Sequence, residues 1–228
     1  MTYSHPELEG SRQHDRVQKP ADAATLILVR RDGGSPRVLM GQRHRSHAFM
    51  PNKYVFPGGR LDAADCRAAF ARDLEEATLS KLSQRMRGRA SIRKARGLAL
   101  AAVRETFEEA GLLIGRRTPE ELPDLSQLIF FMRAITPPGR TRRFDSRFFV
   151  APAEVVGNLD QPIRNGSEEL AEIRWVSLDE AFALDLPLIT IDVLKRLKTH
   201  LDAGNLPSPG CPVSFQYQQG RTWRDEVL

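Results

Sequence analysis

Residues 100–112 carry the most constraining pattern in this 228-residue chain. At about 100° per residue, three carboxylates fall within an arc of about 100° on one flank of a helix, and apolar residues point the opposite way. The carboxylates are Glu105, Glu108 and Glu109, and the residues opposite them are Val103, Phe107 and Ala110. Gly111 follows the cluster and is typical of a helix end. The sequence therefore predicts an amphipathic helix with an acidic flank.

The acidic flank needs something to offset its charge. Three like charges a few ångströms apart repel one another, so they are stable only in water or around a bound cation. Oxygen ligands suit a hard ion such as Mg²⁺ or Mn²⁺. A solvated helix face is the alternative, because acidic runs on helices usually meet only water. Residues 55–59, Val-Phe-Pro-Gly-Gly, favour a built site because they indicate a strand entering a glycine turn.

The helix resembles the second half of the Nudix box, with Arg104-Glu105-Thr106-x-Glu108-Glu109-x-Gly111-Leu112 in the family's order. That family's box begins with a glycine and, after five residues, a glutamate. Here Gly59 is followed after five residues by Asp65, which is acidic but shorter. Arg104 stands 45 positions after Gly59 instead of the family's 14, so the resemblance implies a box split by 31 additional residues.

One subgroup of the family carries such an insertion. Phe49-Met50-Pro51, followed by the segment from Val55 to Asp65, resembles this subgroup, which includes a mammalian peroxisomal enzyme that cleaves coenzyme A. The resemblance spans about residues 24 to 182. It implies an α/β fold, the Nudix α/β/α sandwich with a mixed β-sheet between helices, plus an inserted helical segment.

The resemblance also implies roles for residues. Glu105, Glu108 and Glu109 would hold Mg²⁺ or Mn²⁺ together with a backbone carbonyl of the glycine turn, from Gly59 or its neighbour Gly58. Arg104 would position a neighbouring glutamate by paired hydrogen bonds; a surface arginine is the alternative.

The general base and the substrate contacts are less constrained. Family members take the base from the helix or from a later loop, so Glu169 is the predicted base and the alternatives are Glu105, Glu168 and Glu172. The predicted substrate-binding residues are Arg43, Phe56, Arg142 and Arg147. Arg43 stands 13 residues before Phe56, as in the coenzyme A type, but His44, Ala48 and Asn52 replace the expected Ser or Ala, Arg and Gly.

Charge is concentrated in two basic groups. The chain has a formal net charge of +5 and a pI near 9.5, which favours an anionic partner. The first group, without any acidic residue, is Lys81, Arg85, Arg87, Arg89, Arg93, Lys94 and Arg96; the second is Arg140, Arg142, Arg143 and Arg147. Either could contact phosphates, and a solvated surface is the alternative for both.

Composition excludes several other classes. No apolar run approaches the roughly 18 residues that span a bilayer, and the polar start lacks a signal-like apolar core, so we expect a cytoplasmic protein without a membrane partner. Cys66 and Cys211 are too few for a disulfide framework and are expected to be free thiols. His44 and His47 lack the further ligands of a zinc site.

Periodicity and turn residues outline the elements. Predicted strands cover residues 25–29, 38–42, 54–56, 128–134, 147–150 and 173–176, and predicted helices follow the capping box Ser177-x-x-Glu180 and cover residues 190–200. Residues 1–20 are expected to be a flexible segment, 21–204 the Nudix domain with a helical insertion at about 66–96, and 205–228 a tail. Within the insertion, Phe70, Leu74 and Ala77 have helical spacing, and Gly88 is a plausible break.

The resemblance to the Nudix box implies a metal-dependent diphosphatase. Its substrate would be a nucleoside diphosphate linked to another moiety, most plausibly coenzyme A or its thioesters, with ADP-ribose, NADH or a dinucleoside polyphosphate as rivals. An enzyme that processes RNA caps is the second hypothesis, although the first basic group lacks the interleaved aromatics that stack on bases, so nucleic acid is not expected. The third is a non-catalytic ligand sensor. A homodimer is compatible with the sequence.

Overall fold

Strand β1 (Ala21–Arg30) is the centre of the sheet. It pairs in parallel with β6 (Phe144–Pro152) along most of its length and antiparallel with β2 (Arg37–Arg43). Its residues from 26 to 29 are all fully buried apolar side chains, as expected for a strand covered on both faces.

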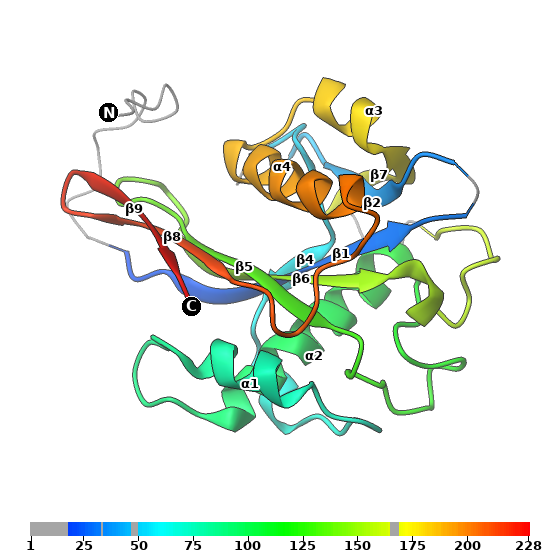
Figure 1. Ribbon diagram of the computed structural model, residues 1–228, viewed down its shortest axis with the longest axis horizontal. Coiled ribbons are helices and arrows are strands. Elements are labelled where there is room, and N and C mark those ends of the chain that lie inside the picture. Colours follow the sequence, from blue (N-terminus) through cyan, green and yellow to red (C-terminus); the bar gives the residue numbers. More distant parts are fainter. Residues whose placement is uncertain (1–17, 33, 47–49, 165–168) are drawn as a thin grey trace.

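The computed structural model describes residues 18–32, 34–46, 50–164 and 169–228. The other strands of this part are β3 (Tyr54–Val55), β4 (Gly58–Arg60), β5 (Ile129–Ile135), β7 (Leu170–Ser177), β8 (Ser214–Gln219) and β9 (Thr222–Val227). They form one mixed sheet in the order β3-β2-β1-β6-β5-β8-β9, with β4 added to β1 and β7 added to β2 (Figure 1).

Helices cover both faces of this sheet. Helices α1 (Glu76–Ser83) and α2 (Ile92–Ala110) lie on one face, and α3 (Leu178–Ala183) and α4 (Leu188–Asp202) lie on the other (Figure 1). Alternate residues of β1 point to opposite sides: Leu26 and Leu28 pack in the cluster that contains the α2 side chains, and Ile27 and Val29 pack with those of α4. The predicted α/β sandwich with a mixed sheet is therefore confirmed.

Local signals in the sequence account for several helix ends. The Ser91 hydroxyl accepts a hydrogen bond from the Lys94 N–H at the start of α2. The predicted capping box is present at α3, where Ser177 and Glu180 exchange hydrogen bonds of 2.8 and 3.2 Å between side chain and backbone. Gly111 ends α2 with φ 70°, a left-handed conformation that favours glycine.

The predicted helix through Phe70 and Leu74 is wrong. The short 3-10 turn η2 (Asp65–Arg67) is followed by extended chain, because the Ala71 N–H donates to the Pro123 carbonyl and Arg72 accepts from Leu125. Helix α1 begins only at residue 76. Gly88, with φ 76°, does lie between α1 and α2, but α2 then runs from Ile92 through the acidic cluster without a break at the predicted end of the insertion.

The segment assigned to a tail contributes two strands. β8 pairs in parallel with β5, and β9 pairs antiparallel with β8. Ser214, Phe215 and Gln216 of β8 are buried, although the strand is rich in polar residues and gives a weak sequence signal. Residues 1–17 lie outside the described part of the chain.

Two smaller expectations concern membranes and thiols. Within the described residues, no helix combines the length and the apolar character needed to cross a bilayer. Cys66 and Cys211 are both unpaired thiols, as expected.

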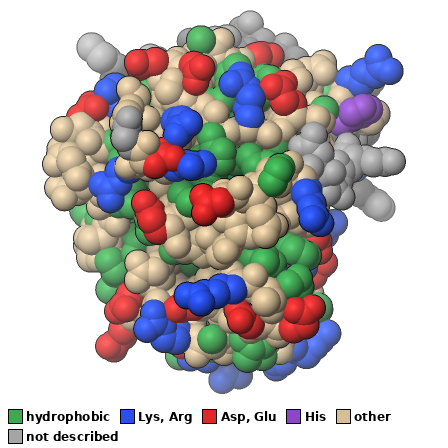
Figure 2. Space-filling view, turned by 90° about the vertical axis from the view of Figure 1, so that its right-hand side faces the viewer, with side chains coloured by type: hydrophobic (Ala, Val, Ile, Leu, Met, Phe, Trp, Pro, Cys, Tyr) green, Lys and Arg blue, Asp and Glu red, His purple; other side chains and the backbone are tan. Residues whose placement is uncertain are grey.

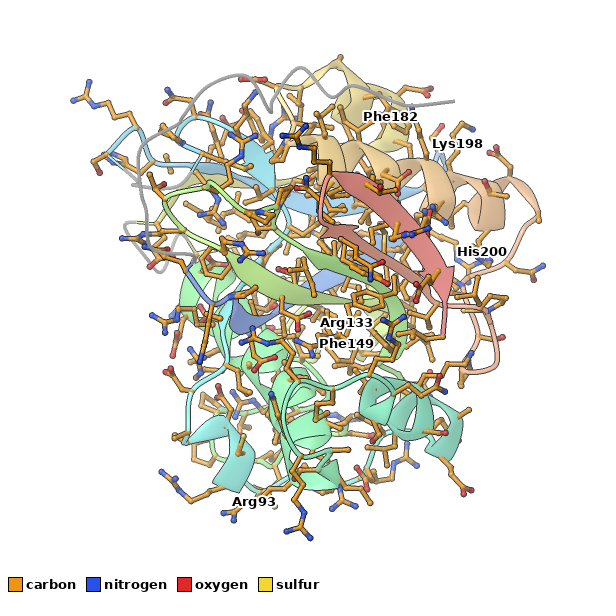
Figure 3. The ribbon with its side chains drawn as sticks, turned by 90° about the vertical axis from the view of Figure 1, so that its left-hand side faces the viewer. Arg93, Arg133, Phe149, Phe182, Lys198 and His200 are labelled. Carbon is orange, nitrogen blue, oxygen red and sulfur yellow. The ribbon has the colours of Figure 1, made fainter. Side chains whose placement is uncertain are left out.

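Buried charges join α2 to three strands. Arg133 of β5, only 1% exposed, donates two hydrogen bonds of 2.8 Å to the carboxylate of Asp145 on β6. Arg147 donates to Asp22 of β1 at 2.7 Å, and Asp22 also forms an ion pair with Lys94 of α2. Burial opposes ionisation of Asp22, but Lys94 and Arg147 hold its pKa below the ordinary value. Figure 3 shows Arg133 between the α4 side, marked by Lys198 and His200, and the opposite side, marked by Arg93.

We expect Asp145→Ala to lower the free energy of unfolding by about 3–5 kcal/mol, because it leaves Arg133 buried without its carboxylate and removes one of the two carboxylates that pair with Arg147. Urea unfolding measures this change. The control is Asp202→Ala, which removes an exposed i,i+4 pair with Lys198 and should cost about 0.5 kcal/mol or less. Equal losses in the two variants would contradict the proposed importance of the buried pair.

Candidate active site

The C-terminal half of α2 and the strand β4 form the centre of the candidate site. The Gly58 N–H donates a hydrogen bond of 2.9 Å to Glu109 Oε2. A Cβ at Gly58 would lie 2.5 Å from the Ala24 carbonyl oxygen and 2.7 Å from Thr25 Cα, so no larger residue fits without moving backbone. The sequence indicated a carbonyl of this turn as a ligand, and the structure adds an N–H group that holds Glu109.

Gly59 leaves the space that the Glu105 carboxylate occupies. A Cβ at this position would lie only 2.1 Å from Glu105 Oε1 and 2.6 Å from Oε2. The two glycines therefore have different tasks: Gly58 lets β4 approach β1, and Gly59 admits a carboxylate.

Arg104 connects the helix to the segments before it. Its Nε and Nη2 donate to the two carboxylate oxygens of Asp65 at 2.8 and 3.1 Å. Its Nη1 donates to Glu105 at 3.0 Å and Glu108 at 2.9 Å, and Nη2 also reaches the Arg60 carbonyl at 3.0 Å. Hydrogen bonding to Asp65 raises the pKa of the guanidinium. Arg104 is therefore an organising residue, not a solvated surface arginine.

Asp65 is the residue that sequence reasoning undervalued. In the sequence it differs from the family pattern only in being aspartate instead of the longer glutamate. In the structure it is 3% exposed and binds Arg104 through both carboxylate oxygens. Its Oδ2 also accepts the Asp62 N–H at 2.8 Å, which fixes the carboxylate. The turn η2 brings Asp65 to α2 across a separation of 39 residues. The signal was present in the glycine-to-acid spacing, but its partner could not be assigned.

The three glutamates differ in their surroundings, so the prediction of one open acidic flank is corrected. Glu108 is exposed, whereas Glu109 is 4% exposed. Burial raises the pKa of Glu109 to about 8, and the nearby charges of Glu105 and Glu169 act in the same direction. Burial also raises the pKa of Glu105, against the effect of Arg104.

The apolar flank is corrected as well. Val103 and Ala110 are buried, but Phe107 is half-buried and lies 5.3 Å from the guanidinium of Arg116, outside the main apolar clusters. The buried side of α2 is rotated so that it includes Thr106 and Glu109.

Arg43 and Glu169 lie beside the buried carboxylate. The charges of Glu109, Glu169 and Arg142 all act on Arg43, and burial lowers the pKa of Arg43. The Glu169 carbonyl accepts the His44 N–H at 2.9 Å, which joins the start of β7 to the end of β2. The structure thus brings the predicted Arg43, Arg142 and Glu169 to the same region as the helix glutamates.

The other base candidates are placed differently. Glu172 accepts a hydrogen bond from Tyr54 at 3.0 Å and forms an ion pair with Arg174 on the same strand. These contacts suit a role in supporting β7. Glu168 lies outside the described residues, as do His47, Ala48 and Phe49.

Two predicted substrate contacts are buried parts of the fold. Phe56 is 4% exposed and packs in the α4-side cluster. Arg147 is 1% exposed, and its guanidinium binds Asp22 and the Asp145 carbonyl. We therefore assign both residues a structural role, which corrects the expectation from charge and spacing.

The first basic group is mostly occupied by contacts within the chain. Arg96 binds Asp73 through paired hydrogen bonds, Arg85 forms an ion pair with Glu226, and Lys94 does so with Asp22. The remaining contacts are made to backbone carbonyls by Lys81, Arg87 and Arg93. On the face shown in Figure 2, basic and acidic side chains are interspersed. Most of the first basic group is therefore bound within the chain.

The donor chemistry of the site fits a hard divalent cation. Burial raises the pKa values of Glu105 and Glu109, and a nearby cation would offset the cost of their negative charges. Across the described residues, no three His, Cys, Asp or Glu side chains are already grouped as a metal-binding set. Arg104 instead holds Glu105 and Glu108, and Gly58 holds Glu109.

Comparisons with known proteins find a matching family model and a relative. Residues 92–197 match the family model described as the NUDIX domain. A Caenorhabditis elegans protein provisionally named nudix hydrolase 7 is 29% identical, over 83% of this chain and 66% of its own length, so the chain spans slightly less than two thirds of that relative.

Solved structures share the fold. The NUDIX hydrolase from Alicyclobacillus acidocaldarius has a TM-score of 0.61 and 25% identity, covering 78% of this chain and 90% of that one. The NUDIX domain of Shewanella oneidensis NrtR, crystallised with ADP ribose, has a TM-score of 0.52 and 10% identity, covering 87% and 99%. This second likeness concerns the fold alone.

The raised pKa of Glu109 makes the stability of the metal-free protein depend on pH. Its value of about 8 in the folded chain exceeds the ordinary 4.5, so the folded chain keeps a proton that the unfolded chain releases between these pH values. This contribution to stability is full below pH 4.5 and falls by about 1.4 kcal/mol per unit as the pH rises to 8. We expect Glu109→Gln to flatten the pH dependence of urea unfolding in chelator. Identical slopes in both proteins would contradict the assignment.

The two glycines should respond differently to an added methyl group. Gly58→Ala meets backbone atoms and a φ of 156°, so we expect a loss of about 1–3 kcal/mol in thermal or urea unfolding. Gly59→Ala meets the movable end of Glu105 and should cost less than about 1 kcal/mol. Gly34→Ala, with nothing within 4 Å of its Cβ, is the neutral control. A larger loss for Gly59→Ala than for Gly58→Ala would contradict these roles.

Proposed function

We propose that this chain is a Nudix hydrolase, because residues 92–197 match the NUDIX domain and a nudix hydrolase relative is 29% identical. We propose that it hydrolyses the diphosphate linkage between a nucleoside and another moiety. The observation that carries the proposal is the joining of two distant segments, in which Asp65 holds Arg104 and the glycines of β4 receive Glu105 and Glu109. A chain that kept the acidic helix without the hydrolase activity would not need Asp65 and the β4 glycines to position its arginine and glutamates.

We propose Glu105, Glu108 and Glu109, with a carbonyl of Gly59, as the groups that hold Mg²⁺ or Mn²⁺. Such an ion supplies charge compensation for phosphate oxygens and a lower pKa for bound water. Arg104 keeps Glu105 and Glu108 together, and the Asp65 carboxylate offsets the positive charge of Arg104. The Gly58 N–H orients one oxygen of Glu109 and leaves the other for a ligand.

Glu169 is our proposed general base. Its charge acts to raise the pKa values of both Glu105 and Glu109, so it lies near the helix carboxylates. Glu105 remains the alternative, because burial raises its pKa, which is the direction that favours a general base. A flattened acidic limb of the pH–rate profile in Glu169→Gln, but not in Glu105→Gln, would favour Glu169.

Coenzyme A or one of its thioesters is the substrate we propose. Arg43 has the spacing of the coenzyme A type and lies beside Glu109 and Glu169, where an anionic group of a substrate would reach it. Asn52 stands where that type has glycine, and it adopts φ 63°, which asparagine tolerates better than most residues. We propose that the segment between β4 and α2, which contains η2 and α1, is the insertion that splits the box.

The rival functions have less support in the described residues. A cap-processing enzyme would need free basic groups for RNA, but most of the first basic group is bound within the chain. A ligand sensor would tolerate loss of the carboxylates, yet all three glutamates and Arg104 are kept and held in place.

We expect Glu108→Gln and Glu109→Gln each to reduce turnover by about two orders of magnitude or more, because each removes a charge that offsets the cation. Steady-state kinetics with Mg²⁺ measure this, and unfolding curves verify that the variants are folded. Glu120→Gln, a change on an exposed loop, is the matched control and should keep full activity. Full activity in both helix variants would refute the proposed metal site.

A panel of diphosphates tests the substrate. It would contain coenzyme A, acetyl coenzyme A, ADP-ribose, NADH, a dinucleoside polyphosphate and capped RNA, each with Mg²⁺ and with Mn²⁺. We expect the highest kcat/KM for coenzyme A or its thioester, and a loss in Arg43→Ala that appears mainly in KM. Reaction in ¹⁸O-labelled water, read by mass spectrometry, identifies the phosphorus that is attacked. A higher kcat/KM for another member of the panel would replace coenzyme A.

A further inference from the structure

Strand β9 is an open edge of the sheet. It pairs with β8 on one side, and no other strand of the described residues lies on its outer side. Among all the described residues, four large apolar side chains are exposed. Two of them are on β9: Trp223 at 45% and Val227 at 72%. Open edges with apolar residues favour pairing with another strand.

Alternate backbone groups of β9 face outward. The Leu228 N–H donates to the Val213 carbonyl at 2.9 Å, which fixes the hydrogen-bonding phase of the hairpin. Antiparallel strands alternate between bonded and non-bonded pairs, so Arg224 and Glu226 also bond to β8. The N–H and C=O groups of Trp223, Asp225 and Val227 therefore point away from β8, where a further strand would meet them.

We propose that a second copy of this chain adds its β9 to this edge, antiparallel, with a two-fold axis at Asp225. A symmetric contact of this kind uses the same strand from both copies. In this register Trp223 lies opposite the partner's Val227, and Arg224 lies opposite the partner's Glu226. The copies exchange about six backbone hydrogen bonds through the three outward residues.

The side chains specify this register. Residues directly opposite each other lie on the same face of a sheet, so apolar side chains meet on one face and opposite charges on the other. The described contacts include no ion pair for Arg224, which is exposed. Glu226 binds Arg85 and accepts a hydrogen bond from Tyr217 within its own copy, and its side chain is still 38% exposed. In a register that pairs Trp223 with the partner's Asp225, the two Arg224 side chains would lie opposite each other. Their like charges would repel, and Val227 would have no apolar partner.

The Asp225 carboxylates at the axis are compensated within each copy. Each binds Arg196 of α4 at 2.6 Å and the Ser214 hydroxyl at 2.6 Å. Their position opposite each other therefore brings together two carboxylates that already have partners within their own copies. The contact is small, so we expect a weak, concentration-dependent dimer. The proposal does not depend on the hydrolase activity.

Amide hydrogen exchange, followed by NMR or mass spectrometry at several protein concentrations, tests the edge directly. We expect protection of the Trp223, Asp225 and Val227 N–H groups to rise at least tenfold from the monomer to the dimer range defined by sedimentation. The Arg224 and Glu226 N–H groups should be protected at every concentration. Concentration-independent exchange of the outward groups would overturn the proposal, whether they are unprotected or covered by another segment of the same chain.

Two variants and one control complete the test. Arg224→Glu faces the partner's Glu226 and should raise the dissociation constant at least tenfold in sedimentation equilibrium. Val227→Pro removes one outward N–H without touching the bonds to β8 and should have a similar effect. Arg221→Glu makes the same charge change in the turn beyond the paired residues and should leave the constant unchanged. A monomer at all concentrations, or a dimer that both edge variants leave unchanged, would overturn the proposal.

Discussion

The paired hydrogen bonds between Arg104 and Asp65 are the interaction on which the candidate site depends. They join residues 39 positions apart, across a segment that contains α1 and the irregular chain around it. Because Arg104 also binds Glu105 and Glu108, the same guanidinium that fixes the distant segment arranges the acidic side chains of α2. Asp65 can do this with a short side chain because η2 carries it close to the helix.

Burial of a carboxylate gives the site its chemical character. Glu109 lies between β4 and α2 with a single described hydrogen bond, from Gly58, and its pKa rises to about 8. Ionising a buried carboxylate costs free energy, and a nearby cation reduces that cost. The fold therefore favours positive charge beside Glu109. The buried network of Arg133, Asp145 and Asp22 differs, because each charge there already has a partner.

Local interactions were predictable from the sequence, and distant ones were not. The acidic helix, its end at Gly111 and the capping box of α3 follow from spacing and backbone preference within a few residues. Strand β8 and the extended chain near Phe70 depend on pairing with remote segments, which periodicity does not report. Arg147 illustrates the same limit: its charge suggested a phosphate contact, but an aspartate 125 positions away binds it inside the fold.

Proton release on binding tests most directly whether the buried Glu109 and its neighbours bind a divalent cation. Isothermal titration of Mg²⁺ or Mn²⁺ near pH 7, in buffers with different ionisation enthalpies, measures the protons released per ion. The account predicts release of more than half a proton by the wild-type chain, because Glu109 must ionise. It predicts much less release, with weaker binding, in Glu109→Gln. Equal affinity and equal proton release in the two proteins would contradict the account.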